Sequence, residues 1–124
     1  MIYTSYFKRA NDLTNVIKVS ISLKDPTWAK VDYRLPIFAP TWTILKRYKL
    51  YGNEQQYVRD YYDLLIEREP NVTKELDRLE RYAANKTVLL LCWENPNKFC
   101  HRHLLADYAN RGWTEYLEQP SLFD

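Results

Sequence analysis

The chain has 124 residues, 46% of them apolar, which suits one domain with a genuine core, and no apolar run is long enough to span a bilayer. Its formal net charge is only +2, so charge alone selects no class of partner. Glycine occurs only at positions 52 and 112, which excludes both the P-loop and the glycine-rich dinucleotide fingerprint.

The first residues, MIYTSYFKR, lack the basic segment, the apolar stretch and the small-residue cleavage site of a secretory signal. We therefore expect a cytoplasmic protein that has no membrane partner. In that compartment its two cysteines would be reduced.

The N-terminal third predicts two strands followed by an ordered loop. IYTSYF (2–7) and VIKVSISL (16–23) are rich in β-branched and aromatic residues, as strands are, and KRANDLTN between them fits a loop or a single helical turn. Prolines at 26, 36 and 40 exclude a long helix or a central strand from the next segment. We interpret that segment as an ordered loop that lines a pocket.

Three helices are predicted in the middle of the chain. TWTILKRYKLY (41–51) would bury Trp42, Leu45 and Tyr48 and end at Gly52. NEQQYVRDYYDLLIERE (53–69) carries apolar residues at i, i+4, i+7 and i+8, the stripe of an amphipathic helix, and VTKELDRLERYAANK (72–86) gives a shorter one. The basic cluster KRYK with its interleaved aromatics is able to contact a phosphate backbone, although a solvated helix face is the commoner meaning of such a pattern.

The last third predicts a central strand, a helix and a final strand. TVLLLCW (87–93) is a short continuous apolar run, typical of a strand buried on both faces. CHRHLLADYANRG (100–112) reads as a helix with Gly112 in the capping position, and WTEYLE (113–118) as a strand. We therefore predict a single compact α/β domain over residues 1–118, with a small, mostly parallel sheet and flanking helices, and a C-terminal tail over 119–124.

Chemistry-bearing residues concentrate in CWENPNKFCHR, residues 92–102, here called the 92–102 turn. In open α/β sheets ligands gather where strands end and the next helices begin, because free amides and the helix dipole favour anions there. The same dipole lowers the pKa of a nearby cysteine. The expected catalytic residues are Cys92, Glu94, Cys100 and His101. The expected ligand contacts are Arg102, Trp93 and Lys98.

Four interpretations of the 92–102 turn stay open. In the first, a cysteine is a nucleophile and Glu94 or His101 transfers protons. In the second, the turn only binds an anion, through the guanidinium of Arg102. A zinc site is the third, but seven residues separate the cysteines and there is no second pair, so no metal or cofactor is assigned. In the fourth, the cysteines are inert packing groups and Arg102 pairs with Glu94.

The order of motifs along the chain resembles a known family. A strand ending in LLC-x-E, a short proline-containing loop and CHR opening a helix with LLADY resemble the bacterial and phage family catalogued as domain of unknown function 488. IYTSYF, ISLKDPTW, FAPTW with ILKRYK, and QYVRDYYDLL are similar to its phage-associated branch, so the resemblance runs the length of the chain. It implies a compact α/β domain and no established activity. The signature residues that it implies are Cys92, Glu94, Cys100, His101 and Arg102.

The C-terminal tail QPSLFD resembles the short peptide with which bacterial replication and repair proteins dock on the sliding clamp. Leu122 and Phe123 would enter an apolar pocket while Gln119 makes polar contacts. A tail that folds its apolar pair back onto its own domain is the alternative.

The expected function is binding, with modification left open, of a phosphate-containing ligand such as a nucleotide or a nucleic-acid end at the 92–102 turn. The alternative is a non-catalytic interaction protein of phage or host that uses its tail to dock on a replication or defence partner. We expect Arg102→Ala to lose ligand binding and to keep the fold.

Overall fold

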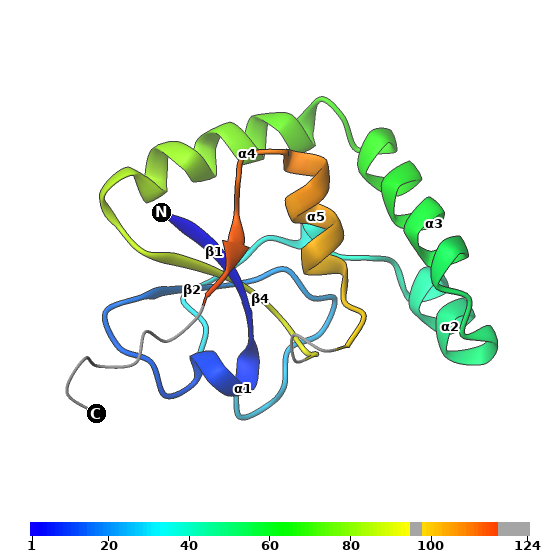
Figure 1. Ribbon diagram of the computed structural model, residues 1–124, viewed down its shortest axis with the longest axis horizontal. Helices are drawn as coiled ribbons and strands as arrows, with labels where there is room; N and C mark the ends of the chain where they lie inside the picture. Colours follow the sequence, from blue (N-terminus) through cyan, green and yellow to red (C-terminus); the bar gives the residue numbers. More distant parts are fainter. Residues whose placement is uncertain (95–97, 117–124) are drawn as a thin grey trace.

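The computed structural model describes residues 1–94 and 98–116, and it arranges them as a parallel sheet with helices on both faces (Figure 1). The strands are β1 (Ile2–Tyr6), β2 (Ile17–Ser20), β3 (Tyr33–Arg34), β4 (Val88–Cys92) and β5 (Thr114–Glu115). The helices are α1 (Phe7–Ala10), α2 (Trp42–Tyr51), α3 (Glu54–Glu67), α4 (Asn71–Tyr82) and α5 (His101–Ala109), with 3-10 turns η1 (Pro36–Phe38) and η2 (Ala83–Asn85).

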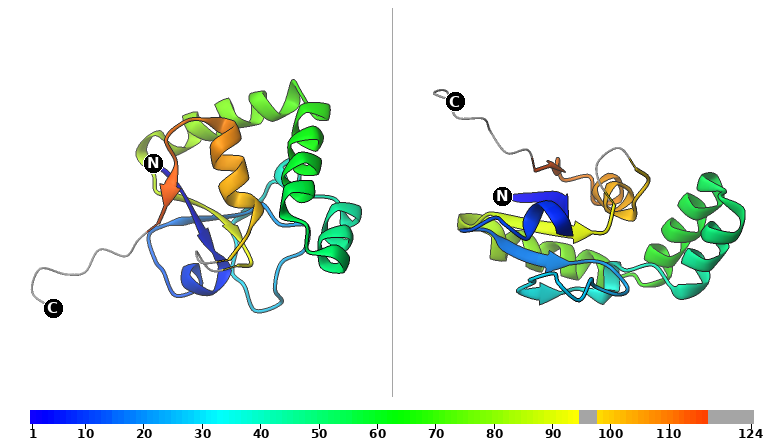
Figure 2. Two further views of the ribbon diagram at one scale, coloured as in Figure 1. Left: turned by 45° about the vertical axis from the view of Figure 1, so that its right-hand side comes forward. Right: turned by 90° about the horizontal axis from the view of Figure 1, so that it is seen from below.

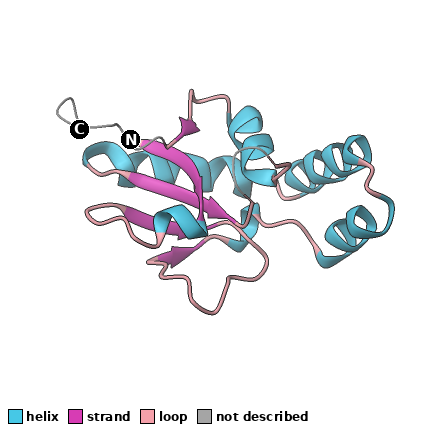
Figure 3. Cartoon of the chain, turned by 60° about the horizontal axis from the view of Figure 1, so that its bottom comes forward, coloured by secondary structure: helices cyan, strands magenta, loops and turns pink. Residues whose placement is uncertain are grey.

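The five strands lie in the order β3-β2-β4-β1-β5, and every neighbouring pair is parallel. Figure 3 shows the central strands running in one direction. All five residues of β4 are buried, as an apolar strand covered on both faces should be. The predicted fold class is therefore confirmed: a single compact α/β domain with a small sheet, here wholly parallel, and flanking helices.

The alternation of side chains along β4 divides the core in two. Val88 and Leu90 face the larger cluster, which also holds the buried residues of α3, α4 and α5. Leu89 and Leu91 face the smaller one, together with Phe7 of α1. The helix that follows β1 and the helix that follows β4 thus cover opposite faces, although β1 and β4 are neighbours. This is a topological switch point, where open α/β sheets form a crevice at the carboxyl ends of their strands.

Several local predictions are confirmed by the caps and the burial pattern. The Thr41 hydroxyl accepts a hydrogen bond from the Ile44 amide at 3.3 Å, which starts α2, and Gly52 ends it with a left-handed φ of 62°. The α3 stripe is buried at Tyr57, Tyr61 and Leu65. No helix within residues 1–94 and 98–116 is both long and apolar enough to cross a membrane.

Other local predictions are wrong. Trp42 is 60% exposed, because α2 buries only Ile44. Helix α5 ends at Ala109, where Asn110 adopts the left-handed conformation with φ of 52°, so Gly112 is not its cap. The proline-rich segment contains the short edge strand β3, which its composition does not reveal.

Candidate functional site

The site lies at the switch point, and Arg102 of α5 is at its centre. The side chain of Arg102 is fully buried, and its guanidinium grips the carboxylate of Glu115 with two hydrogen bonds, Nε to Oε2 at 3.1 Å and Nη2 to Oε1 at 2.9 Å. Thr4 donates to the same carboxylate at 2.6 Å. The guanidinium carbon lies 5.8 Å from the ring centroid of Tyr6. One arginine therefore ties the start of α5 to β1 and β5.

The remaining guanidinium nitrogen of Arg102 reaches the end of β4. Nη1 donates to the sulfur of Cys92 at 3.0 Å and to the backbone oxygen of Glu94 at 2.5 Å. The anion partner of this arginine is Glu115, so the pairing of Arg102 with the Glu94 carboxylate, part of the packing interpretation, is wrong. A cation that donates directly to a sulfur stabilises that sulfur as a thiolate.

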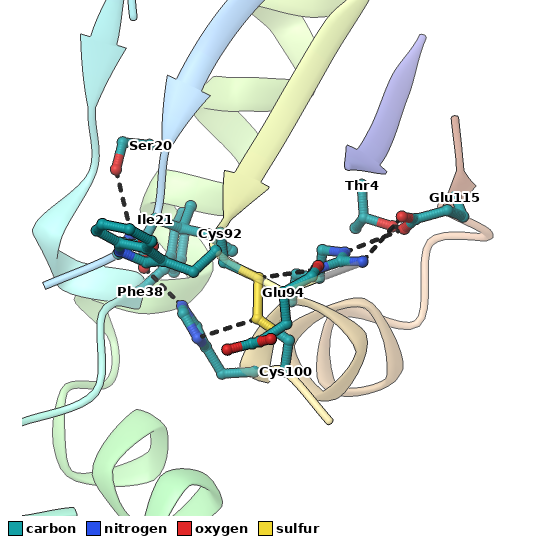
Figure 4. The surroundings of a disulfide bond; sticks show 12 residues. Thr4, Ser20, Ile21, Phe38, Cys92, Glu94, Cys100 and Glu115 are labelled. Carbon is teal, nitrogen blue, oxygen red and sulfur yellow. Dashed lines mark hydrogen bonds and ion pairs between the residues drawn. A yellow bond between two sulfur atoms is a disulfide. The ribbon is translucent and has the colours of Figure 1, made fainter. Parts of the chain in front are cut away.

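The two cysteines are joined by a disulfide across the turn, which Figure 4 shows beneath the end of β4. Both are buried, with Cys92 1% and Cys100 8% exposed. The expectation of two reduced thiols is therefore not met in this structure. Cys100 is the N-cap residue of α5 but its side chain makes no capping hydrogen bond. The sulfurs thus lie at the positive end of the helix dipole.

His101 stands beside the disulfide as a neutral imidazole. Its Nε2 lies 2.7 Å from the carbonyl oxygen of Ile21, which can only accept, so this nitrogen carries the proton. Its Nδ1 faces the sulfur of Cys100 at 3.9 Å. Burial lowers the pKa of His101 to about 4; the bond to Ile21 opposes that shift and the charge of Arg102 adds to it. An unprotonated nitrogen therefore points at a sulfur.

Cys92, Cys100 and His101 are also the residues that could hold a metal. Their donor atoms lie within 4.8 Å of one another, and a histidine whose other nitrogen donates to a backbone carbonyl is the usual metal-binding arrangement. Metal binding requires thiolates, however, and here the sulfurs are bonded to each other. The donor set fits a metal only in the reduced protein.

The other residues predicted for the turn lie at its rim. Trp93 is 51% exposed; its ring meets Phe7 edge-on at 6.0 Å, and its Nε1 donates to the Lys24 carbonyl at 2.6 Å. Lys98 is exposed, and the side chain of Glu94 is partly buried. The predicted tail contacts, Gln119, Leu122 and Phe123, lie outside the described residues. The roles assigned to all these side chains stay predictions.

A polar cluster at the end of β2 escaped the sequence interpretation. Asp25 accepts a hydrogen bond from the Ser20 hydroxyl and pairs with Arg34 Nε at 3.1 Å. Ser22 is 4% exposed, and its hydroxyl has no hydrogen-bond partner within the part of the chain that the structure describes. The segment after β2 lies beside the end of β4, because the Ile21 amide donates to the Leu91 carbonyl at 3.1 Å. Only the proline punctuation of this loop hinted at a site.

A separate hollow of about 610 Å³ lies at the amino ends of the strands. Its lining includes Met1, Ile17, Lys86 and Thr87. None of the predicted site residues borders it, so the chemistry and this hollow are at opposite edges of the sheet.

A family model described as the active DUF488-N3 subclade matches residues 11–111, a span that holds both the β2 end and the 92–102 turn. No curated protein and no solved structure matches the chain.

Proposed function

This chain belongs to the DUF488 family, and from that premise we propose that it binds a phosphate-containing ligand, a nucleotide or a nucleic-acid end, at the 92–102 turn and modifies it through the sulfur of Cys92. The contact between Arg102 and Cys92 carries the proposal, because a buried cation 3.0 Å from a sulfur favours the nucleophilic thiolate. The description of the subclade as active supports a reaction beyond binding.

Anion binding is supported by the surroundings of α5. The helix presents its first amides beside the sulfurs without a side-chain cap, and exposed Lys98 lies just before it. Such a helix start attracts phosphate. All three side-chain nitrogens of Arg102 donate hydrogen bonds to groups of the protein itself. In the proposal, Arg102 therefore positions the sulfur of Cys92 and stabilises its thiolate, and it does not bind the ligand.

The reaction begins from the reduced protein. Two cellular thiols open the disulfide in turn, through a mixed disulfide, and leave joined as a disulfide of their own, so that Cys92 and Cys100 become thiols. This suits a cytoplasmic location in a bacterial or phage-infected cell. Cys100 then has the neutral Nδ1 of His101 as its acceptor. The proposal also requires that opening the disulfide lets a ligand reach Cys92, which is 1% exposed in the oxidised state.

The proposed reaction is a hydrolysis in two steps. The Cys92 thiolate attacks an electrophilic carbon or phosphorus of the ligand, a bond from sulfur to that atom forms, and the leaving group departs with a proton from Glu94. Water then attacks the same atom while Glu94 takes its proton, and the sulfur leaves as the thiolate. One ligand and one water give two products, without net oxidation.

The proposal is tested first on the sulfur. In a Cys100→Ser variant, alkylation of Cys92 by iodoacetamide is followed against pH by mass spectrometry. We expect half-maximal reactivity well below the ordinary thiol pKa of about 8.5. The same protein in denaturant is the control, and should return to the ordinary value. A folded thiol that titrates at or above it rejects sulfur chemistry.

A second test addresses the phosphate. Reduced protein is titrated with one short oligonucleotide that carries a 5′-phosphate and with the same strand ending in a hydroxyl. We expect the phosphorylated strand to bind more tightly, and Lys98→Ala to reduce that preference. Equal affinity for the two strands rejects recognition of a phosphate end at this turn.

A further inference from the structure

Helix α2 exposes an unusual set of side chains for a helix of a compact domain. Trp42, Leu50 and Tyr51 are 60%, 65% and 75% exposed. With Thr43, Lys46 and Arg47 they line a shallow depression of about 350 Å³. We call this surface, together with Lys49, the α2 face. Figure 2 shows that α2 and α3 stand at one end of the molecule, beyond the sheet.

The α2 face is positively charged. The helix has no acidic side chain. Arg47 pairs with Asp60 of α3 at 3.0 Å, whereas Lys46 and Lys49 have no ion-pair partner among residues 1–94 and 98–116. The ammonium of Lys49 lies 5.7 Å from the ring centroid of Trp42. Aromatic and cationic groups therefore alternate on one exposed surface.

The opposite side of α2 contacts the 92–102 turn. The ring of Tyr48 lies 5.3 Å from that of Phe99, the residue before Cys100, and Tyr57 of α3 meets Phe99 edge-on at 5.0 Å. Desolvation, followed by the carboxylates of Glu54 and Glu94, raises the pKa of Tyr48, so Glu94 lies within electrostatic reach of this helix. Helix α2 therefore lies between the α2 face and the 92–102 turn, so that a ligand on this face is separated from the disulfide by the width of that helix.

We infer that the α2 face binds single-stranded nucleic acid and directs the end of a strand to the 92–102 turn. This inference deepens the proposed function and rests on it for the fate of the strand end. Single strands expose base faces that stack on aromatic rings, and their phosphates pair with lysines without base-specific contacts. The lack of acidic side chains on α2 favours an anionic partner over a cationic one.

The test is fluorescence anisotropy of labelled strands of about 12 nucleotides, long enough to track a groove of this kind, with DNA and RNA as separate arms. The reduced full chain is used, and all strands end in a 5′-hydroxyl. We expect Trp42→Ala to weaken binding about ten-fold, with Trp42→Phe retaining most of the affinity because a ring remains. Lys46→Ala combined with Lys49→Ala should lower the slope of log affinity against log salt by about 1.4, since each lysine that no longer neutralises a phosphate accounts for about 0.7.

Matched controls lie elsewhere on the surface. Trp28 is 50% exposed, against 60% for Trp42, so Trp28→Ala removes a ring of similar accessibility. Lys30→Ala with Lys74→Ala removes two exposed lysines outside the α2 face. We expect both controls to bind as the parent does. Equal losses in the control and α2 variants overturn the inference, because they mean diffuse electrostatic attraction.

Two competitors separate the alternatives. Tighter binding to vesicles of phosphatidylserine and phosphatidylcholine, or to polyglutamate, than to the oligonucleotides also overturns the inference. A preference for 5′-phosphate without any effect of Trp42→Ala keeps the proposed function and rejects the α2 face. If binding depends on Trp42 but the pKa of the Cys92 thiol is that of an ordinary cysteine, the α2 face is kept and the proposed function is rejected.

Discussion

Replacement of Arg102 by methionine should destabilise the protein strongly, because it removes one partner of a buried ion pair. Arg102 is 0% exposed, and the side chain of Glu115 retains 16% exposure. Breaking a buried pair costs about 3–5 kcal/mol, since the remaining charge is left uncompensated. Glu115 keeps some water and the hydroxyl of Thr4, so we expect the lower end, about 3 kcal/mol. For a chain of this size that loss lowers Tm by roughly 10–15 °C.

The measurement is urea unfolding of the reduced protein at neutral pH, followed by circular dichroism. A double-mutant cycle with Glu115→Gln isolates the pair, and we expect the double variant to be less destabilised than the sum of the two single variants. A loss below about 1 kcal/mol for Arg102→Met, or strict additivity in the cycle, would contradict the buried pair. The expectation from the sequence, that removal of this arginine spares the fold, treats it as a surface ligand contact and ignores its burial.

Three further outcomes follow from the same structure. The pKa of buried His101 is about 4, whereas that of an unfolded histidine is about 6.5, so between these values only the unfolded chain binds the proton. The free energy of unfolding should therefore fall by up to about 3 kcal/mol as the pH is lowered from about 6.5 to about 4. In a pH series of urea unfolding curves, His101→Gln should weaken this pH dependence. Tyr61→Phe leaves the Phe38 carbonyl, now bonded at 2.7 Å, without its buried donor and should cost about 1–2 kcal/mol in the same assay, and an unchanged midpoint contradicts that bond. Asn110→Gly should raise Tm by a few degrees, because glycine adopts the left-handed conformation without strain, whereas Asn110→Ala should lower it.

The sheet could be predicted well from local patterns, because each of its longer strands is recognisable within a few residues. The apolar run at 87–93 is too short for a helix and too continuous for a surface strand, so its place at the centre follows from burial alone. The 92–102 turn follows from it, since the residues after a central parallel strand and before a helix must lie at the carboxyl edge. Cys92, Cys100, His101 and Arg102 are indeed brought together there.

The partners of these residues could not be predicted in the same way. Glu115 reaches Arg102 because β5 pairs with β1, a contact between residues more than a hundred positions apart that no local pattern encodes. The sequence interpretation therefore chose Glu94, the nearest carboxylate in the chain. The exposure of Trp42 was missed for a related reason: periodicity selects a stripe on α2, but the neighbouring elements decide which residues of it are covered.

Arg102 stabilises the fold and, in the proposal, also stabilises the Cys92 thiolate. Its removal affects both roles at once, whereas Arg102→Lys separates them. Lysine keeps the charge near Cys92 but cannot reproduce the two-pronged grip on Glu115, so stability should fall by about 1–2 kcal/mol. In a Cys100→Ser background the pKa of the Cys92 thiol should stay low with lysine and rise with methionine, as read by alkylation against pH at a temperature where both variants are folded. If the two variants give the same thiol pKa, the guanidinium serves only the fold, and a sulfur nucleophile loses its physical basis.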